Sequence, residues 1–482
     1  MLRSSALKIL LLASAVSDLS AAQVVTISTP GNNSQFQSPA HFIASATSPQ
    51  CTQGVIGMRI YLAPHVVAYK VQSNSIDTQL TLTPGNYKTV VQAWDACGGV
   101  GKTAVNFTVT PKGLKPVRFV YVADGFWSRI VGFTADPQTG ALSHTAQRSV
   151  RLNSRLAYLA ADRGGNRLYA TDADFSFPRG QIYAYFIDRR NGYISPIPGG
   201  PFRTDPWPAG PITVHPSGKF VFVSTASAAG TGILIFAVNP DGSLTAVNTT
   251  PVATNAYVKS LLVDHSGKYL YAMSESPAAI NAFEIDTISG ALTPVPGSPF
   301  PVSIPGCTVT AWDMAESYGR FLYTSDYWAA RVSGYHISGK TGTLDELSGS
   351  PFPAPLSFTC MTTDTTYPLL LATEPSGRFL YAQAAGSGSV MIFSIDAGNG
   401  ALKLIKTVSV TTGFVDTPTA DPSGKFLYYT QDHTATGYFT YGSVGGLVID
   451  PANGDLKVAF WPIDIGPSFS PYSNAIDIVA TP

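Results

Sequence analysis

Hydrophobic and polar residues alternate with two different rhythms along this chain. Between residues 24 and 111, apolar residues occupy every second position in short segments such as VVTIST, HFIASATS and YKTVVQAWD. This alternation is typical of half-buried β-strands, and about seven of them in so short a region predict a β-sandwich. Residues 112–116, within PKGLKP, are expected to form a linker.

From Val117 onward the hydrophobic segments recur about every fifty residues. Each repeat contains an apolar strand, a tight turn, a strand with Leu-Tyr or a variant, a third strand, and a Gly-bearing turn into a fourth. Seven aromatic residues mark the repeats: Tyr121, Tyr169, Phe222, Tyr271, Tyr323, Tyr381 and Tyr428. Four strands per repeat are typical of a propeller blade, so residues 117–482 are expected to form a seven-bladed β-propeller.

The two ends of the repeat region indicate how the ring closes. The first repeat begins directly at its Leu-Tyr-type strand, VRFVYVA, whereas the last is followed by an unassigned strand at residues 474–480. We expect this C-terminal strand to become the innermost strand of the first blade. Closure of that kind removes exposed strand edges, which otherwise promote aggregation.

Composition narrows the possible partners. The 44 Gly and 36 Pro residues suit an all-β chain with many turns, and only 12% of residues are charged, with no net charge. Nucleic-acid binding requires a basic surface, so no nucleic-acid partner is expected. No metal or nucleotide motif is present, and neither a metal nor a cofactor is expected. No segment is long enough for a membrane span.

The first residues have the composition of a secretory signal peptide. Arg3 and Lys8 precede the short apolar run at residues 9–13, and the small residues Ser20-Ala21-Ala22 follow. This order predicts a signal peptide over residues 1–22 and export to the periplasm or the cell exterior. Cys307 and Cys360 lie about one repeat apart, each ahead of a blade's first strand, so we expect them to form a disulfide.

One resemblance concerns the N-terminal region. The segment LTPGNYKTVVQAWDACG resembles a bacterial immunoglobulin-like domain, in which a Gly-x-Tyr turn leads into a strand that ends in an aromatic–Asp corner. The resemblance implies that Tyr87 is the corner tyrosine. It also implies that Cys51 and Cys97 form a disulfide that ties two strand ends together.

A second resemblance covers residues 117–482. The segments HPSGKFVFV, EPSGRFLYA and DPSGKFLYY, with turns such as DPQTGAL and DTISGAL, resemble the seven-bladed lactonase family, which is 6-phosphogluconolactonase-like. The resemblance implies hydrolysis of a lactone or a related ring ester. Members with this activity commonly carry Gly-Pro-Arg-His, whereas this chain has Gly210-Pro211-Ile212-Thr213 at the matching place.

One polar column recurs at the turn between the first and second strands. Its members are Asp162, His215, Asp264, Glu316, Glu374 and Asp421. A catalytic residue needs one special position, whereas this column is repeated in six blades. We therefore expect these side chains to cap the turn by binding backbone N–H groups.

The opposite ends of the second strands vary between blades and predict a site. A propeller gathers these loops around one mouth, where carboxylates can raise one another's pKa and act as general bases. We expect Glu275 or His433 to activate water, and Arg155 or Arg331 to face the substrate carbonyl or acid group. The expected substrate-binding residues are Asp172, Asp326, Lys259, Trp127 and Trp328. Asp side chains at strand ends also commonly bind loop N–H groups, which is the alternative for the carboxylates here.

Two functions fit these observations. The first is an exported lactone hydrolase that acts by general-base activation of water. The second is a non-catalytic extracellular or envelope propeller that binds carbohydrate or protein. Export favours the second, because a phosphorylated sugar lactone is a cytosolic metabolite. An extracellular protein partner through the immunoglobulin-like domain would fit either function.

Overall fold

The computed structural model describes a chain built only from strands and turns. It covers residues 24–62, 66–110, 114–125, 127–172, 180–204, 209–227, 230–302, 311–326, 331–353, 369–384, 388–410, 414–435, 439–468 and 475–482. Within these ranges no helix is present, so the all-β prediction is confirmed, and no helical span suited to crossing a membrane is found. The chain divides into two compact units, a smaller one that ends at Phe107 and a larger one that ends at Pro482.

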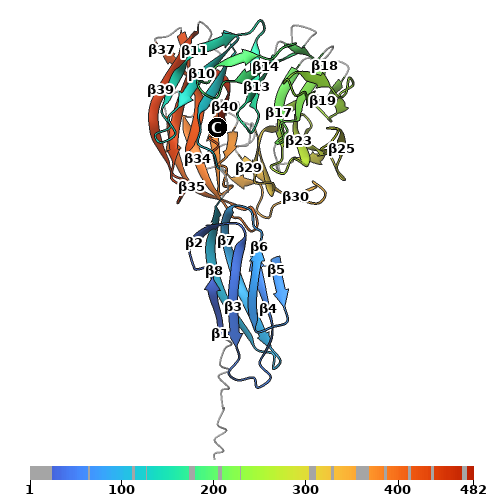
Figure 1. The fold of residues 1–482 in the computed structure, drawn as a ribbon, viewed down its shortest axis with the longest axis vertical. Coiled ribbons are helices and arrows are strands. Elements are labelled where there is room, and N and C mark those ends of the chain that lie inside the picture. The colour runs from blue at the N-terminus through green and yellow to red at the C-terminus, as the bar shows by residue number, and fades with distance from the viewer. Residues whose placement is uncertain are drawn as a thin grey trace, which may run out of the picture. The chain divides into compact units, whose positions relative to one another are not determined.

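The smaller unit contains two sheets (Figure 1). Their strands are β1 (Val24–Thr29), β2 (Ser34–Gln37), β3 (Ala40–Thr47), β4 (Val55–Leu62), β5 (Val66–Val71), β6 (Ser75–Leu80), β7 (Gly85–Asp95) and β8 (Val100–Thr110). One sheet has the order β1-β3-β6 and the other β2-β8-β7-β4-β5. Phe42 of the first sheet packs edge-on against Phe107 of the second, with ring centroids 5.7 Å apart. The disulfide Cys51–Cys97 is confirmed.

The larger unit contains seven antiparallel sheets, the blades of a propeller. Blade one consists of β40 (Ala475–Thr481), β9 (Phe119–Asp124), β10 (Arg129–Ala135) and β11 (Leu142–Arg151). Blade two consists of β12 (Leu156–Ala161), β13 (Arg167–Asp172), β14 (Gln181–Ile187), β15 (Ile194–Pro196) and β16 (Phe202–Arg203). Blade three consists of β17 (Ala209–Val214), β18 (Phe220–Ser227), β19 (Gly230–Val238), β20 (Leu244–Ala246) and β21 (Val252–Ala253).

Blade four consists of β22 (Val258–Val263), β23 (Tyr269–Glu275), β24 (Ala278–Ile285), β25 (Leu292–Pro294) and β26 (Phe300–Pro301). Blade five consists of β27 (Ala311–Ser317), β28 (Phe321–Asp326), β29 (Arg331–Ile337), β30 (Leu344–Glu346) and β31 (Phe352–Pro353). Blades six and seven consist of β32 (Leu369–Thr373), β33 (Phe379–Ala384), β34 (Ser389–Ile395) and β35 (Leu402–Ser409); and β36 (Phe414–Ala420), β37 (Phe426–Ala435), β38 (Phe439–Ile449) and β39 (Leu456–Ser468).

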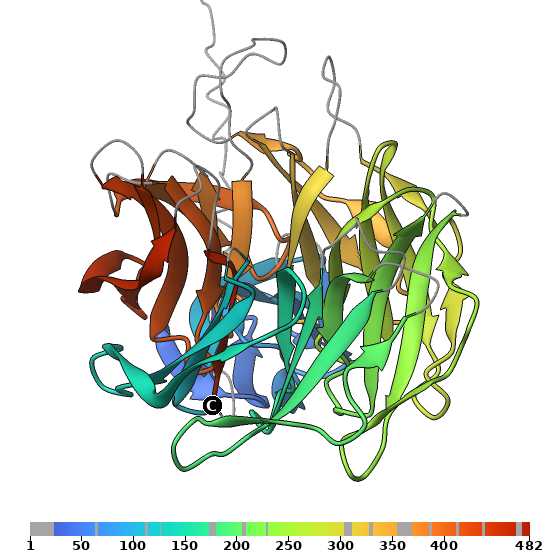
Figure 2. The same ribbon diagram turned by 90° about the horizontal axis from the view of Figure 1, so that it is seen from above.

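The first strands of the blades form a ring around a common axis. Each inner strand lies against the inner strand of the next blade, and β40 lies against both β36 of blade seven and β12 of blade two. β40 pairs with β9, with Val479 opposite Tyr121, so the chain's last strand lies innermost in its first blade. In Figures 1 and 2 the end marked C lies among the teal strands of blade one.

The marker tyrosines join neighbouring blades. All are fully buried, and the phenol of Tyr121 donates to the carbonyl oxygen of Gly192 in blade two at 2.9 Å. Four equivalent bonds run from Tyr271 to Gly342, Tyr323 to Gly400, Tyr381 to Gly454 and Tyr428 to Gly140. The last of these joins blade seven to blade one. The repeated Leu-Tyr therefore pairs with the repeated Gly turn of the following blade.

The turn glycines are required for two reasons. Each of the five acceptor glycines has φ between 70° and 75°, the left-handed region that favours glycine. A Cβ atom on Gly400 would also lie 2.5 Å from the Phe321 ring, which packs on this glycine from the preceding blade. The same aromatic-on-glycine contact recurs at Gly140 with Phe426. One motif thus supplies both a hydrogen bond and an aromatic contact between blades.

The polar column caps the turns in most blades, as predicted. Asp264 accepts the backbone N–H groups of Ser266, Lys268 and Tyr269, and Asp421 binds its own turn in the same way. Asp162 and Glu374 also accept turn N–H groups. The His215 ring is hydrogen-bonded to the carbonyl of Gly267 in blade four.

The assignment of Glu316 to this column was wrong. The turn of blade five is one residue shorter, so that Ser317 pairs directly with Phe321 and donates to the Gly377 carbonyl. Glu316 therefore belongs to the end of the inner strand, opposite Leu322. Tyr318 accommodates the shorter turn with a φ of 52°, which is uncommon for a residue with a side chain.

The phenol–glycine bond predicts a contrast between two tyrosines. Tyr323→Phe leaves the Gly400 carbonyl without its donor and should lower the free energy of unfolding of the propeller by about 1–3 kcal/mol. Tyr169→Phe should be neutral or stabilising, because the buried Tyr169 hydroxyl has no hydrogen-bond partner among the described residues. Denaturant unfolding of both variants checks this, and equal losses of stability would contradict it.

Candidate functional site

The inner strands present one residue per blade at an equivalent level of the axis. Each lies two positions before the residue that pairs with the marker aromatic. These axial residues are Tyr158, Pro211, Ser260, Asp313, Leu370, Thr417 and Asp477. In every blade but the sixth, the register of the inner strand shifts just before or at this point. Such bulges redirect side chains and are frequent near functional sites.

Two of the axial residues are carboxylates that join adjacent blades. Asp477 of β40 accepts the backbone N–H of Leu159 in blade two at 2.7 Å, and Asp313 of β27 accepts that of Leu371 in blade six at 3.0 Å. Burial raises the pKa of Asp313 to about 6 and that of Asp477 to about 7, and the charge of Asp313 adds to the rise at Asp477. Both residues are only half-buried.

A pair of phenols lies near Asp477. Tyr158 of blade two and Tyr257, immediately before β22 of blade four, are hydrogen-bonded through their hydroxyls. Burial is the main cause that raises the pKa of both, and the nearby charge of Glu275 raises both further. The charge of Asp477 acts on Tyr158 as well. The two phenols are therefore neutral hydrogen-bond donors at physiological pH.

An ion pair completes the cluster. Lys259 lies at the bulge of β22, and its Nζ is 3.2 Å from Oε2 of Glu275 at the end of β23. The Lys259 ammonium also lies 5.1 Å from the centroid of the Tyr257 ring. The backbone N–H of Glu275 donates to the Tyr257 carbonyl, which fixes these two segments to each other. We call Tyr158, Tyr257, Lys259, Glu275 and Asp477 the axial cluster.

A polar network holds the loop that carries Tyr257. The buried Asn281 side chain of β24 donates to Asn255 Oδ1 at 2.7 Å and to Ser274 Oγ at 2.8 Å. Asn255 in turn donates its backbone N–H to Asn281 and its side-chain amide to the Pro277 carbonyl. A buried network with its groups satisfied fixes the position of a loop, which is what a pre-organised site requires.

Comparison with known proteins identifies the family. The family model described as "Lactonase, 7-bladed beta-propeller" matches residues 192–310 and 316–439, just over half of the chain. The chain belongs to the 7-bladed β-propeller lactonase family.

Individual relatives are more distant. A 6-phosphogluconolactonase of Serratia proteamaculans is 26% identical over 184 residues, 38% of this chain and 52% of the relative. One of Sodalis glossinidius is 25% identical over 189 residues, with the same coverage. The chain thus spans about half the length of the curated relatives that it matches.

Solved structures support the fold. The Pseudomonas aeruginosa periplasmic gluconolactonase has a TM-score of 0.58 at 17% identity, covering 76% of this chain and 99% of that one. A protein from Lactobacillus plantarum has a TM-score of 0.54 at 15% identity, covering 76% and 100%. At these identities the likeness concerns the propeller fold alone.

The structure brings together only part of the predicted site. Glu275 and Lys259 form the ion pair, although they were assigned separate roles. Arg155 is exposed just before β12, and Arg331 begins β29 of blade five. Neither arginine bonds to Glu275 among the described residues. Asp172 is buried and accepts the backbone N–H of Gln181, in keeping with the capping alternative.

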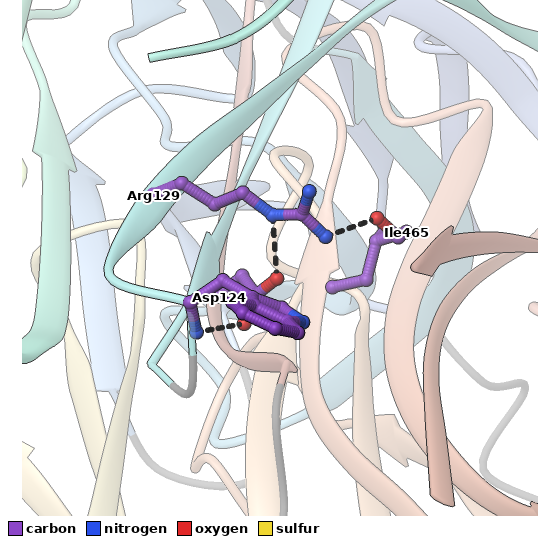
Figure 3. Close-up of polar contacts among 4 residues, drawn as sticks. Asp124, Arg129 and Ile465 are labelled. Atoms are coloured by element: carbon purple, nitrogen blue, oxygen red, sulfur yellow. Dashed lines mark hydrogen bonds and ion pairs between the residues drawn. The ribbon is translucent and has the colours of Figure 1, made fainter. Parts of the chain in front are cut away.

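Blade one shows the same structural use of a strand-end carboxylate (Figure 3). Asp124 accepts the backbone N–H of Trp127 at 3.0 Å and forms a 2.7 Å ion pair with Arg129, whose guanidinium also donates to the Ile465 carbonyl of blade seven. Arg151 lies over the Trp127 ring at 5.7 Å. Trp127 is therefore packed against an arginine at this position.

The remaining predicted residues stay predictions. Asp326 is buried at the end of β28. The His433 side chain lies outside the described part of the structure, although its backbone is in β37, and so do Trp328, Cys307 and Cys360.

Sequence reasoning missed Tyr158, Tyr257, Asp313 and Asp477. The axial position became recognisable only from the pairing of each inner strand with its marker aromatic. The sequence did contain one signal, the residue two positions before the one that pairs with the marker aromatic. This residue differs from blade to blade, whereas the turn column repeats.

The raised pKa of Asp477 predicts a pH-dependent stability. Its carboxyl titrates near 4 in the unfolded chain and about 7 in the folded one, so the folded state binds more protons between these values. Stability should therefore fall as pH rises from about 4 to about 7, by at most about 1.4 kcal/mol per pH unit for this group.

Asp477→Asn should lack this component. The stability of the native chain relative to the variant should decrease over that pH range and stay level above it, measured by urea unfolding of the propeller. The exposed Asp345→Asn serves as the control and should follow the native chain in parallel. A constant difference between the native chain and Asp477→Asn would contradict the assignment.

Proposed function

We propose that this chain hydrolyses a lactone or a related ring ester at the axial cluster. The observation that carries the proposal is the Lys259–Glu275 ion pair beside two neutral phenols, all near the axis of the propeller. Membership of the lactonase family supports it, as do the curated relatives named 6-phosphogluconolactonase. For this chain we propose the substrate class, a lactone or a related ring ester.

Glu275 is the proposed general base. Its side chain is about one-third exposed, and Lys259 Nζ lies 3.2 Å from Oε2. We assign the proton transfer to Oε1, because Oε2 is the oxygen that takes part in the ion pair. In the first step, Oε1 takes a proton from water as the water oxygen bonds to the lactone carbonyl carbon. A tetrahedral intermediate with a negative carbonyl oxygen forms.

Lys259 and the phenols are the proposed donors to that oxyanion. In the second step the carbon–oxygen bond of the ring breaks, and the proton held by Glu275 passes to the departing ring oxygen. The product is an open-chain hydroxy acid, and Glu275 returns to its ionised form. One water is consumed, and no oxidant, reductant or cofactor takes part.

One departure from active family members bears on the substrate. In the place of the commonly found Arg-His, this chain has Ile212 and Thr213, and Pro211 takes the axial position of blade three. Ile212 is buried. This replacement removes a cation and favours a less strongly anionic ligand, and it also supports the second candidate, a propeller that binds carbohydrate without chemistry.

Export and an immunoglobulin-like N-terminal domain complete the proposal. The basic and apolar residues before Gln23 have signal-peptide order, and the Cys51–Cys97 disulfide suits an oxidising compartment. The fold resembles that of a protein named as a periplasmic gluconolactonase. The two packed sheets of the smaller unit support the immunoglobulin-like assignment.

The ion pair and the phenols predict separate kinetic effects. With a panel of aldonolactones and simple γ- and δ-lactones, followed by acid release, Glu275→Gln should lower kcat/KM by about 10²–10⁴-fold through loss of the base. Tyr158→Phe should lower kcat about tenfold with little effect on KM, because its donor acts on developing charge. The exposed Glu284→Gln on neighbouring β24 is the matched control and should keep full activity.

Unchanged turnover in Glu275→Gln would contradict the assignment of the base. Saturable binding of sugars on a glycan array without turnover of any lactone would favour the binding propeller instead.

Export is tested by expression of the full chain with a C-terminal tag. We expect the tagged protein in the periplasmic or culture fraction, with an intact mass that corresponds to a start at Gln23. Retention of residues 1–22 in a cytosolic protein would contradict export.

A further inference from the structure

The opposite end of the propeller axis holds a cavity. It has a volume of about 660 Å³ and lies where the inner strands turn into the second strands. We call this end the turn face. Residues at or next to the ends of five inner strands line the cavity: Ala161, Val214, Val263, Glu316 and Ala480. Four blades thus contribute an apolar side chain at the strand end, whereas blade five contributes the Glu316 carboxyl there.

Glu316 does not cap the turn of its own blade. The shorter turn of blade five gives the capping position to Ser317 and leaves Glu316 on the strand. Its Oε1 is buried and has no hydrogen-bond partner among the described residues. Burial raises the pKa of Glu316 to about 8, the charge of Asp264 adds to this rise, and the His265 backbone N–H and Arg163 oppose it. At neutral pH this carboxyl is therefore largely protonated and can donate.

A positioned guanidinium lies next to this carboxyl. Arg163 Nη2 lies 3.3 Å from His265 Nε2, and burial and the Arg163 charge lower the pKa of His265, so the neutral imidazole accepts this bond. The His265 ring stacks on Tyr318 with centroids 4.2 Å apart. Tyr318 holds a left-handed backbone conformation, and such conformations cluster at ligand sites. Arg163 has further N–H donors and is exposed to the cavity mouth.

We propose that the turn-face cavity binds a small carboxylate with an apolar or aromatic body. The ligand carboxylate would accept hydrogen bonds from Arg163 and from the protonated Glu316, with Lys115 adding positive charge at the lining. The body would pack on the rings of Pro216, Pro375 and Pro422 and on the apolar strand ends. This site is separate from the axial cluster and does not depend on lactone hydrolysis.

Benzoate is a suitable probe, with calorimetry and ligand-observed NMR as the readouts. We expect saturable binding to the full chain at pH 7, weakened at least tenfold by Arg163→Ala and by Glu316→Ala. Arg190→Ala, whose side chain is 93% exposed on a different turn, should bind like the native chain. Lys259→Gln should also bind normally, which separates this cavity from the axial cluster. Circular dichroism and unfolding midpoints verify that each variant is folded.

The pH dependence gives a second readout that a purely structural Glu316 would not move. Affinity for benzoate should fall as pH rises above about 8, because ionised Glu316 repels the ligand carboxylate. Glu316→Gln keeps an N–H donor and should bind with no such fall. The other titratable groups at the cavity are Lys115, Asp162, Arg163, His265, Tyr318 and Glu374, with Asp264 acting on Glu316 from the adjacent turn. None of these is altered in Glu316→Gln.

Several results would overturn the proposal. They are the absence of benzoate binding, equal affinity in the native chain, Arg163→Ala and Glu316→Ala, or tighter binding of benzylamine than of benzoate. The last would show that the cavity selects cations.

Discussion

The hydrogen bond from a marker tyrosine to the turn glycine of the next blade is the interaction on which the propeller depends. It is made between buried groups by five of the seven marker residues, and Tyr428 of blade seven makes it with Gly140 of blade one. A buried carbonyl without a donor is costly, so each bond specifies both the neighbour and its register. The glycine also admits the aromatic ring that precedes the tyrosine in the motif. The repeated motif is thus explained by contacts between blades rather than within them.

A ring closed in this way leaves its inner strand edges facing the axis. Their unpaired N–H groups need acceptors, and Asp313 and Asp477 supply them for Leu371 and Leu159. These carboxylates lie in surroundings that raise their pKa, and Asp477 lies near the Tyr158 phenol of blade two. Residues that support the inner strand edges and residues proposed to carry out chemistry therefore lie at the same level of the axis. At the axial position the blades carry different residues, and the same is true of the strand ends that line the turn-face cavity.

The sequence made the repeat, the propeller and the capping turns predictable because each depends on local motifs. Glu275 and Lys259 were also found, since they lie at loop ends where blades differ. Tyr158 and Asp477 were not, because their shared position follows only from strand pairing across the axis. Glu316 was placed in the wrong column because a turn shortened by one residue shifts the count without changing the motif. Capping carboxylates and carboxylates proposed for catalysis look alike in sequence, and only their bonding partners distinguished Asp172 and Asp124 from Glu275.

The central claim is that residues from separate blades form one binding centre at the axis. A crystal structure of the chain with a sugar δ-lactam, a stable analogue of a lactone, tests it most directly. The account predicts density for the lactam between Lys259, Glu275 and the Tyr158–Tyr257 pair, with the ring carbonyl toward the ammonium or the phenols. A lactam bound elsewhere on the propeller, with these side chains in contact only with solvent and one another, would contradict it.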